Sequence, residues 1–486
     1  MVHLNDSSLF RQQAYVAGFW VDGESGERQE IFNPSTRETI GFVPALGSGE
    51  IRRAIEQAEA AWPLWREKTS HERAVILRRW HDLILDNKLD LARIMTLEQG
   101  KPLDESMGEV AYAASFIEWF AEEGKRVYGD VIPSPAHGKR MVVIREPVGV
   151  CAAITPWNFP AAMITRKVGP ALAAGCVMLV KPALETPFSA LALAELADRA
   201  GIPAGVIQVV TGEAEIIGRV FTDSPAVRKL SFTGSTETGK LLMRQCAANV
   251  KRISLELGGH APFIVFDDAD PKAAVAGAIA SKYRNSGQTC VCANRFLVQD
   301  GIHDQFVERL AEAASRLRVA DGFTNGAEQG PLINPAAVEK VESHVRDAVE
   351  KGARVVCGGG RHPLGGNFFE PTVIAGVQQE MIVAREETFG PVSPVFRFAG
   401  EPDAIRMAND TEYGLAAYFY TRDAGRVWRM ADALEYGIIG INTGMVSTAA
   451  APFGGMKQSG IGREGGRYGI DEYLEIKYLC MGGIND

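Results

Sequence analysis

Short apolar runs alternate with stretches of helical spacing from residue 141 onward, and this alternation limits the fold more than any other feature of the chain. The apolar runs are residues 148–154, 177–180, 206–210 and 229–232. A helical stretch follows each run, which is the pattern of repeated strand–helix–strand units. The sequence therefore predicts an α/β fold with an open, mostly parallel sheet.

The residues before this alternation have a different pattern. Apolar residues recur at helical spacing in residues 51–62 and 77–84, so the first hundred or so residues are predicted to be largely helical after an extended start. A second α/β series begins near residue 261, with an apolar run at 263–266 and a helix around 273–283. A chain of 486 residues, 46% of them hydrophobic, is long enough for two or three domains with separate cores.

Charge and hydropathy argue against several classes of protein. The net charge is −9 and the basic residues form no stripe, so nucleic acid is not an expected partner. The longest apolar run, residues 168–180, contains Pro170 and two glycines and stops at Lys181, so it is too short to span a bilayer. The first 21 residues lack the apolar core of a signal peptide. No membrane partner is therefore expected.

The seven cysteines are widely spaced, apart from Cys290 and Cys292. An odd number at this spacing does not suit a disulfide framework. No second cysteine or histidine pair completes a zinc site. The sequence therefore predicts no metal, a reducing compartment and, by default, the cytoplasm.

Two glycine-rich segments look like phosphate-binding loops. Residues 460–465 match the GxGxxG pattern but follow no predicted strand, so a dinucleotide site is not expected there. Residues 234–240 match most of the P-loop pattern, but Leu241 stands where an NTPase needs Ser or Thr. This second segment still joins a strand to a helix, whose N-terminus favours an anion such as a cofactor pyrophosphate. An ordinary strand-to-helix turn is the alternative.

Four side chains could carry chemistry. Cys290 lies in a loop of small and polar residues and could be a nucleophile if a base deprotonates it. Glu256 ends an apolar strand before two glycines, where an apolar setting would raise its pKa toward that of a general base. Asn158 follows another strand in a rigid loop, and its amide could donate to an oxyanion. Lys181 ends a third strand and could reach a ribose or a phosphate. Each residue taken alone also has a purely structural explanation.

Seven motifs, four of which contain these residues, occur in one order along nearly the whole chain. They are PWNFP at 156–160, KPA at 181–183, FTGSTETG at 232–239, ELGG at 256–259, GQTC at 287–290, EETFGP at 386–391 and PFGG at 452–455. In this order they resemble the motifs of the aldehyde dehydrogenase superfamily. The resemblance implies a Rossmann-like cofactor domain with an open parallel sheet, a second α/β catalytic domain and a small β extension for oligomerisation.

The resemblance also implies domain boundaries and an assembly. The cofactor domain would comprise residues 1–126 and 148–258, and the catalytic domain would comprise residues 259–459 with Cys290. Residues 127–147 and 472–486 would form strands that pair with a neighbouring subunit. A homodimer or homotetramer is therefore expected.

Carried onto this chain residue by residue, the resemblance implies three catalytic roles. Cys290 attacks the aldehyde, Asn158 and the Cys290 amide stabilise the oxyanion, and Glu256 activates the water that hydrolyses the thioester. A nicotinamide cofactor accepts the hydride. The residues implied to hold the cofactor are Thr155, Pro156, Trp157, Lys181, Pro182, Leu184, Gly234, Ser235, Leu257, Glu387 and Phe389.

Within the superfamily the chain most resembles the succinate-semialdehyde dehydrogenases, in residues 163–169, 283–285, 290–292 and 451–455. This implies that Arg166, Arg284 and Ser447 hold a distal carboxylate, for which a guanidinium is the suitable partner in a dry pocket. Structural ion pairs are the alternative for the two arginines. The implied reaction is oxidation of succinate semialdehyde to succinate.

Other substrates and other classes of protein remain as alternatives. Glutarate semialdehyde differs by one methylene, which changes binding by only about 1–3 kcal/mol. An uncharged aldehyde is a further alternative. A non-catalytic protein of the same fold and a cofactor-free thiol hydrolase lie outside this class.

Two residues bear on cofactor choice and on regulation. NAD-selective relatives commonly have an acidic residue three positions after the lysine that matches Lys181, and that position here is Leu184. The missing acid removes repulsion against a 2′-phosphate, so NADP is slightly favoured over NAD. Cys292 could form a reversible disulfide with Cys290 and act as a redox switch.

Overall fold

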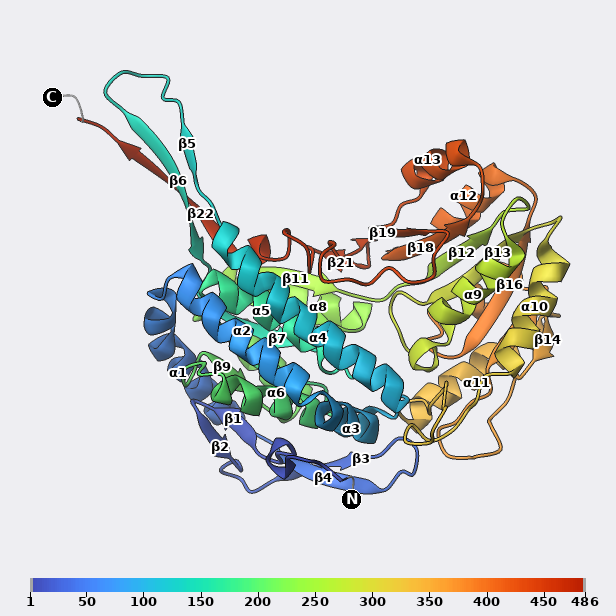
Figure 1. Cartoon of the computed structure of the whole chain (residues 1–486), viewed down its shortest axis with the longest axis horizontal. Helices are drawn as coiled ribbons and strands as arrows, with labels where there is room; N and C mark the ends of the chain where they lie inside the picture. The colour runs from blue at the N-terminus through green and yellow to red at the C-terminus, as the bar shows by residue number, and fades with distance from the viewer. Residues whose placement is uncertain (1–2, 484–486) are drawn as a thin grey trace.

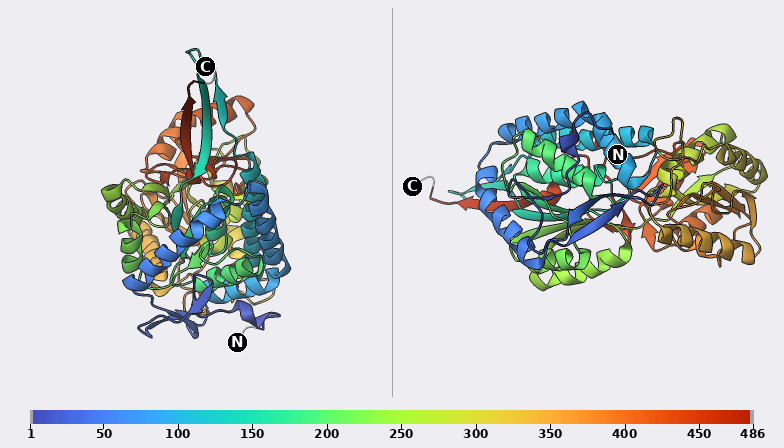
Figure 2. Two further views of the ribbon diagram at one scale, coloured as in Figure 1. Left: turned by 90° about the vertical axis from the view of Figure 1, so that its left-hand side faces the viewer. Right: turned by 90° about the horizontal axis from the view of Figure 1, so that it is seen from below.

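Two open sheets, each covered by helices, form two lobes that lie side by side (Figure 1, Figure 2). The structure is a computed structural model, and it describes residues 3–483. Both sheets are mostly parallel. The predicted α/β class, with two separate sheets, is therefore confirmed.

The first sheet has five parallel strands at its centre and antiparallel strands at its edges. Its strands, in spatial order, are β2 (Phe19–Val21), β1 (Ala14–Val16), β9 (Ile207–Val209), β8 (Val177–Lys181), β7 (Val150–Ile154), β10 (Val227–Thr233), β11 (Arg252–Glu256) and β21 (Gly460–Ile461). The chain runs from β7 outward to β9 and then returns to place β10 on the other side of β7. Loops at the carboxyl ends of β7 and β10 diverge at such a reversal, and the crevice between them is where open α/β sheets bind ligands.

Helices cover both faces of this sheet. They are α1 (Ser48–Arg66), α2 (Ser70–Asp86), α3 (Lys88–Gln99), α4 (Leu103–Glu123), α5 (Ala162–Ala174), α6 (Pro187–Arg199), α7 (Ala214–Asp223) and α8 (Thr236–Cys246). All 13 residues of α5 are buried, because the helix packs against α4 and β8 and is apolar on nearly every side. Arg166 and Lys167 are the charged residues of α5, so each needs a partner within the core. Across residues 3–483, no helix is both long and apolar enough to cross a bilayer.

The second lobe is built in the same way around its own sheet. The strands in spatial order are β14 (Arg354–Cys357), β15 (Thr372–Ala375), β16 (Val392–Phe398), β13 (Ala293–Gln299), β12 (Ala261–Val265), β18 (Ala416–Tyr420) and β19 (Ile438–Ile441). Its helices are α9 (Pro271–Lys282), α10 (His303–Ser315), α11 (Pro335–Glu350), α12 (Glu401–Asn409) and α13 (Ala424–Ala433). Two apolar clusters, one on each face of the sheet, form the core of this lobe.

Two small ladders and one projecting arm complete the fold. The ladders pair β3 (Arg28–Phe32) with β4 (Thr39–Pro44), and β17 (Tyr413–Gly414) with β20 (Met456–Lys457). The arm is an antiparallel sheet of β22 (Leu474–Met481), β6 (Arg140–Pro147) and β5 (Asp130–Ile132). It extends away from the first lobe (Figure 1). Large apolar side chains are exposed on it, with Tyr128, Val131 and Ile476 each at least 70% exposed.

Candidate active site

The candidate residues meet where the carboxyl edge of the first sheet faces the amino edge of the second. Strands β7, β10 and β11 end at this place, and Cys290 lies just before β13 of the other lobe. A cavity of about 420 Å³ opens between them. Its lining residues from the motifs are Pro156, Trp157, Asn158, Gly234, Ser235, Leu257, Cys290, Glu387 and Phe389.

Cys290 is partly exposed at this cavity because the preceding backbone makes an unusual reversal. Asn285, Ser286 and Gly287 have consecutive positive φ angles of 51°, 57° and 76°. A Cβ on Gly287 would lie 2.2 Å from the carbonyl oxygen of Gly390, so only glycine fits there. Burial raises the pKa of the Cys290 thiol to about 12, to which the nearby Glu387 carboxylate contributes. The thiol is therefore neutral at pH 7 and needs a base before it can attack.

Asn158 is buried beside Cys290 and spans the two lobes. Its Nδ2 donates to the carbonyl oxygen of Gln288 at 3.0 Å. The backbone carbonyl oxygen of Asn158 accepts hydrogen bonds from Lys101 Nζ at 2.7 Å and from Asn285 Nδ2 at 2.9 Å. The amide has two N–H groups, so one of them is left for an oxyanion formed at Cys290.

Lys101 is held in place by a buried carboxylate that no sequence motif marked. Its Nζ pairs with Glu109 Oε2 at 2.5 Å, and both side chains are 1% exposed. Glu109 Oε1 accepts from the backbone amides of Ala161 and Ala162 at the start of α5. The ion pair therefore fixes the loop that carries Asn158 to the first turn of α5.

Glu256 ends β11 and is 4% exposed. Its Oε2 has no hydrogen-bond partner among the described residues. Burial raises its pKa well above the usual value, and the neighbouring Glu464 carboxylate raises it further. Burial therefore favours the protonated form of the Glu256 carboxyl, which acts as a base only when that proton is lost.

Glu464 is a buried carboxylate beside the candidate site that sequence reasoning missed. Its carboxylate lies between Arg166 Nε at 2.9 Å and Lys167 Nζ at 2.5 Å. Lys167 Nζ also donates to Ser231 Oγ at 3.0 Å. The segment 460–465 drew attention only for its glycines, and its first two residues form the edge strand β21, which pairs with β11. That pairing brings Glu464 toward Glu256.

The three predicted substrate residues differ in their surroundings. The ion pair between Arg166 and Glu464 is the structural alternative considered for this arginine, yet Arg166 Nη2 is buried with no partner within the described chain. The Arg166 guanidinium also lies 4.0 Å from the ring of Phe453. Arg284 is partly exposed and lies 5.3 Å from the Phe159 ring. Ser447 is partly exposed in the loop after β19, which also carries Phe453.

Several of the implied cofactor residues enclose one end of the cavity. The rings of Trp157 and Phe389 meet edge to face at 5.5 Å. Ser235 caps α8 by accepting a hydrogen bond from the Thr238 amide at 3.3 Å. Glu387 Oε1 accepts from the amide of Gly259 at 3.3 Å. Burial raises the pKa of Glu387 to about 7, against the opposing effect of Lys340.

Four implied cofactor residues lie outside the lining of this cavity. Lys181 ends β8, is buried, and has a pKa lowered by that burial, while its carbonyl accepts a hydrogen bond from the Thr155 amide at 3.1 Å. Pro182 follows it. Leu184 is 38% exposed and lines a neighbouring cavity of about 430 Å³. Ile333 and Asn334 belong to the linings of both cavities, so the two are adjacent.

Unsatisfied groups in the crevice suit a dinucleotide. Thr155 Oγ1 and Thr233 Oγ1, at the ends of β7 and β10, are buried and have no partner in the part of the chain that the structure describes. Ser235 and the N-terminus of α8 border the same cavity, where a helix favours a phosphate. A ribose and a pyrophosphate would satisfy these groups, so the residues fit NADP or NAD.

Cys292 lies on the buried side of its loop. It is 1% exposed, and its thiol donates to the carbonyl oxygen of Gly287 at 3.1 Å. Lys282 Nζ lies 3.8 Å from its Sγ. A disulfide with Cys290 would therefore require both of these contacts to break.

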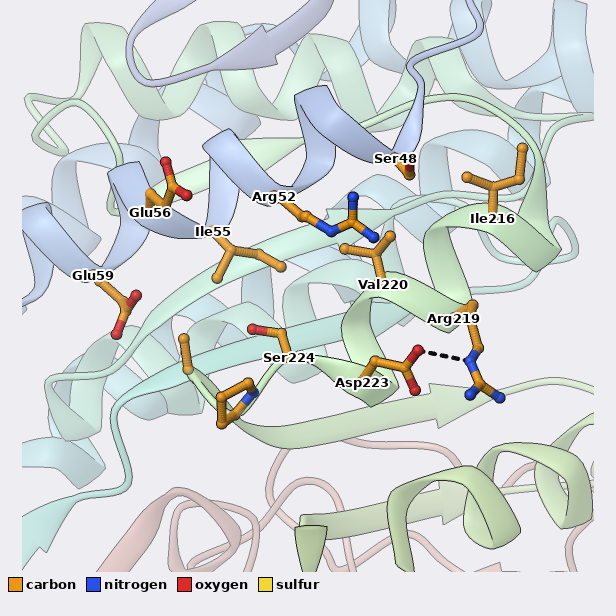
Figure 3. A pocket seen from close by; sticks show the side chains of 12 residues that line it. Ser48, Arg52, Ile55, Glu56, Glu59, Ile216, Arg219, Val220, Asp223 and Ser224 are labelled. Carbon is orange, nitrogen blue, oxygen red and sulfur yellow. Dashed lines mark hydrogen bonds and ion pairs between the residues drawn. The ribbon is translucent and has the colours of Figure 1, made fainter. Parts of the chain in front are cut away.

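A separate cavity, of about 530 Å³, lies between α1 and α7 (Figure 3). Arg52, Glu56 and Glu59 border it from α1, and Arg219 and Asp223, which pair at 2.7 Å, border it from α7. None of the candidate site residues lines it. Between residues 3 and 483, no group of three or more His, Cys, Asp or Glu side chains could hold a metal ion.

Hydrogen bonds join the two lobes around the cavity. Besides the bond from Asn158 to Gln288, Gln99 Nε2 donates to Asn285 Oδ1 at 2.9 Å. The Arg37 side chain donates to Asn367 Oδ1 at 2.9 Å, and both residues line the same neighbouring cavity as Leu184. We call this set of contacts the seam.

Comparisons with known proteins agree with this geometry. Residues 20–479 match the model of the aldehyde dehydrogenase family. The chain is 63% identical to the succinate-semialdehyde dehydrogenase (NADP(+)) GabD of Escherichia coli, over 99% of each chain. It is 62% identical to a glutarate-semialdehyde dehydrogenase of Pseudomonas aeruginosa, over 99% of this chain and 100% of the other. A solved structure of the succinate-semialdehyde dehydrogenase from Burkholderia pseudomallei matches with a TM-score of 0.98 and 64% identity, over 99% of each chain.

Proposed function

Since the chain belongs to the aldehyde dehydrogenase family, we propose that it oxidises succinate semialdehyde to succinate. The observation that carries the proposal is the placement of two guanidinium groups, those of Arg166 and Arg284, near Cys290. Arg166 acts on the pKa of Cys290, and Arg284 lies over Phe159, the neighbour of Asn158. Two permanent cations beside the nucleophile suit an aldehyde whose far end is a carboxylate.

Glutarate semialdehyde is the second candidate substrate. The Pseudomonas aeruginosa relative that carries this name is 62% identical, almost as similar as the Escherichia coli enzyme. The two substrates have the same charged ends and differ by one methylene. A pocket discriminates such a difference by only about 1–3 kcal/mol, so we expect both to be oxidised.

The first half-reaction belongs to Cys290 and Asn158. Ionised Glu256 can take the proton of the thiol, whose pKa of about 12 otherwise keeps it neutral. The thiolate adds to the aldehyde carbon, and the carbonyl oxygen gains the negative charge. The free N–H of the Asn158 side chain and the Cys290 backbone amide stabilise that charge. Bound NADP or NAD would accept the hydride, which leaves an acyl group on the Cys290 sulfur.

The second half-reaction belongs to Glu256. Glu256 first loses to solvent the proton that it took from the thiol. Its carboxylate then removes a proton from water, whose oxygen attacks the thioester carbon and releases the acid, and the Cys290 thiolate takes that proton back. Burial and Glu464 raise the pKa of Glu256, so the carboxylate holds that proton strongly once it is taken. Arg166 and Lys167 oppose this rise, which sets the balance between the acid and base forms.

The cofactor, the assembly and the location follow from the same residues as further parts of the proposal. NADP is favoured slightly over NAD because Leu184 brings no negative charge against a 2′-phosphate. The arm of β5, β6 and β22 supports a homodimer or homotetramer, because its exposed apolar side chains are suited to a subunit contact.

The domains divide as residues 1–126 with 148–258, residues 259–459, and the arm. A nucleophilic thiol needs reducing conditions, which favours the cytoplasm.

The test is a comparison of aldehydes with a matched arginine control. Nicotinamide reduction is followed with succinate semialdehyde, glutarate semialdehyde and butanal, each with NADP and with NAD. We expect succinate semialdehyde with NADP to give the highest kcat/KM, and Cys290→Ala to abolish turnover. Arg284→Met should harm the acidic aldehydes far more than butanal, whereas the exposed Arg316→Met should change neither. Equal kcat/KM values for butanal and the acidic aldehydes, with Arg284→Met neutral, would contradict the proposed substrate class.

A further inference from the structure

Several buried hydrogen-bond donors around Cys290 have no hydrogen-bond partner among residues 3–483. They include the hydroxyl of Tyr112, Nη2 of Arg166 and Nε of Arg284. Arg166 Nε and Thr289 Oγ1 also lack a hydrogen bond, although Arg166 Nε lies 2.9 Å from Glu464 Oε2 as an ion pair. A buried polar group without a partner is expensive, and native proteins leave very few of them. Unpaired donors on α4, on α5 and in the loop before Cys290 indicate that a ligand supplies the missing acceptors.

Tyr112 lies on the inner face of α4, beside the arginine of α5. Its ring meets the Phe116 ring edge to face at 4.9 Å. The Arg166 guanidinium lies 5.2 Å from that same Phe116 ring. Tyr112 and Arg166 therefore flank one aromatic side chain, and the tyrosine is the next donor along this wall.

The second arginine lies next to a residue that contacts the same helix, because the backbone amide of Asn285, which follows Arg284, donates to Glu105 of α4 at 2.9 Å. Burial raises the pKa of the Tyr112 phenol, while Arg166 and then Arg284 oppose that rise, and Cys290 acts on it as well. A phenol with a raised pKa stays protonated at neutral pH, so it is a donor. Two cations and one neutral donor match a carboxylate, which has two oxygens and about four acceptor sites.

We propose that the Tyr112 hydroxyl is a third donor to the distal carboxylate of the aldehyde substrate, together with Arg166 and Arg284. This rests on the proposed function, because it assumes an acidic aldehyde in this pocket. The Glu464 carboxylate lies 2.9 Å from Nε of Arg166, so the Nε side of this guanidinium is not available to the substrate carboxylate. Arg166 therefore binds the substrate through its Nη groups. A neutral hydroxyl supplies the missing bond without adding a further positive charge to the core.

The test removes one oxygen atom. Tyr112→Phe keeps the ring on Phe116 and deletes only the hydroxyl. We expect kcat/KM for succinate semialdehyde to fall about tenfold to a hundredfold, mainly through KM, because a hydrogen bond to a charged group is lost. The value for butanal should stay the same. Inhibition by succinate should weaken by a similar factor, while inhibition by butyrate should not change.

Matched variants separate the inference from the proposed function. Tyr15→Phe deletes a hydroxyl that bonds to Asp198 instead, and we expect it to leave the ratio of acidic to uncharged aldehyde unchanged. If Arg284→Met lowers that ratio and Tyr112→Phe does not, the inference is wrong and the proposed substrate class stands. If the unmodified enzyme shows no preference for the acidic aldehyde and no inhibition by succinate, both fail. Cofactor binding by each variant, measured by fluorescence, verifies that it is folded.

Discussion

Lys101 is the residue whose replacement tests most directly how the oxyanion amide is positioned. Lys101→Met removes the cation of the buried pair and keeps most of the side-chain volume. The Glu109 carboxylate, 1% exposed, then has no cation to offset its charge, and the Asn158 carbonyl keeps only the bond from Asn285. We expect both stability and turnover to fall, for these two separate reasons.

The size of the loss in stability follows from the burial of the Lys101–Glu109 ion pair. Removing one partner of a buried ion pair costs about 3–5 kcal/mol, because the remaining charge is left uncompensated. The midpoint of thermal unfolding should fall by roughly 3–5 °C, at about 1 °C per kcal/mol for a chain of 486 residues. The exposed pair of Lys125 and Glu122, at 3.0 Å, is the matched control. Lys125→Met should cost no more than about 1 kcal/mol.

The double variant Lys101→Met with Glu109→Gln separates charge from position. It removes both charges, and the glutamine oxygen can still accept from the amides of Ala161 and Ala162. Most of the lost stability should therefore return. Turnover should not return, because the bond from Lys101 to the Asn158 carbonyl is still missing. We expect kcat to stay at least tenfold low, within the ~10²–10³ that loss of an entire oxyanion donor costs.

The assays are thermal unfolding at one protein concentration and steady-state kinetics with saturating cofactor. A double variant as unstable as Lys101→Met would show that an unpaired charge is not the cause of the instability. An unchanged kcat in Lys101→Met would show that Lys101 does not position Asn158. Either result would refute the corresponding half of the reasoning.

Two further predictions concern the pH dependence and the thiol pair. Glu464→Gln removes a negative charge that raises the pKa of Glu256, so the rise of kcat with pH should move to lower pH in a series from pH 5.5 to 9.5; a rise at the same or higher pH would contradict this. If Cys290 and Cys292 form a switch, peroxide should inactivate the enzyme and dithiothreitol should restore it. Cys292→Ala should not show this reversible loss, and equal loss and rescue in that variant would dismiss the switch.

The strands could be predicted from the sequence because they are buried on both sides. The run at 148–154 became β7 (Val150–Ile154), and the run at 177–180 became β8 (Val177–Lys181). A parallel strand covered by helices is apolar at every position, so it is visible without any tertiary knowledge. The family and the motifs around Cys290, Glu256 and Asn158 were visible for another reason, since each motif is short and contiguous.

The surroundings of those residues could not be predicted in this way. Lys167 and Glu464 are 297 positions apart, and nothing in either local sequence indicates that they pair. Lys101 lies in the short connection between α3 and α4, and Tyr112 lies within α4, and both look like ordinary surface or core positions in the sequence. The positive φ angle at Asn285 also depends on distant residues, because Gln99 and Glu105 of the other lobe hold its side chain and its backbone amide.

The activity of this enzyme is sensitive to small displacements of the two lobes at the seam. Neither lobe contains the whole of the proposed active site, since Glu256 and Asn158 belong to one lobe and Cys290 to the other. A displacement of about 1 Å between them would leave every helix and strand intact, yet it would separate the thiol from its base and its oxyanion donor. Mild heating or denaturant that loosens only the seam would silence the enzyme while its circular dichroism remained native. A measurement of catalytic rate therefore detects a displacement between the lobes that circular dichroism does not detect.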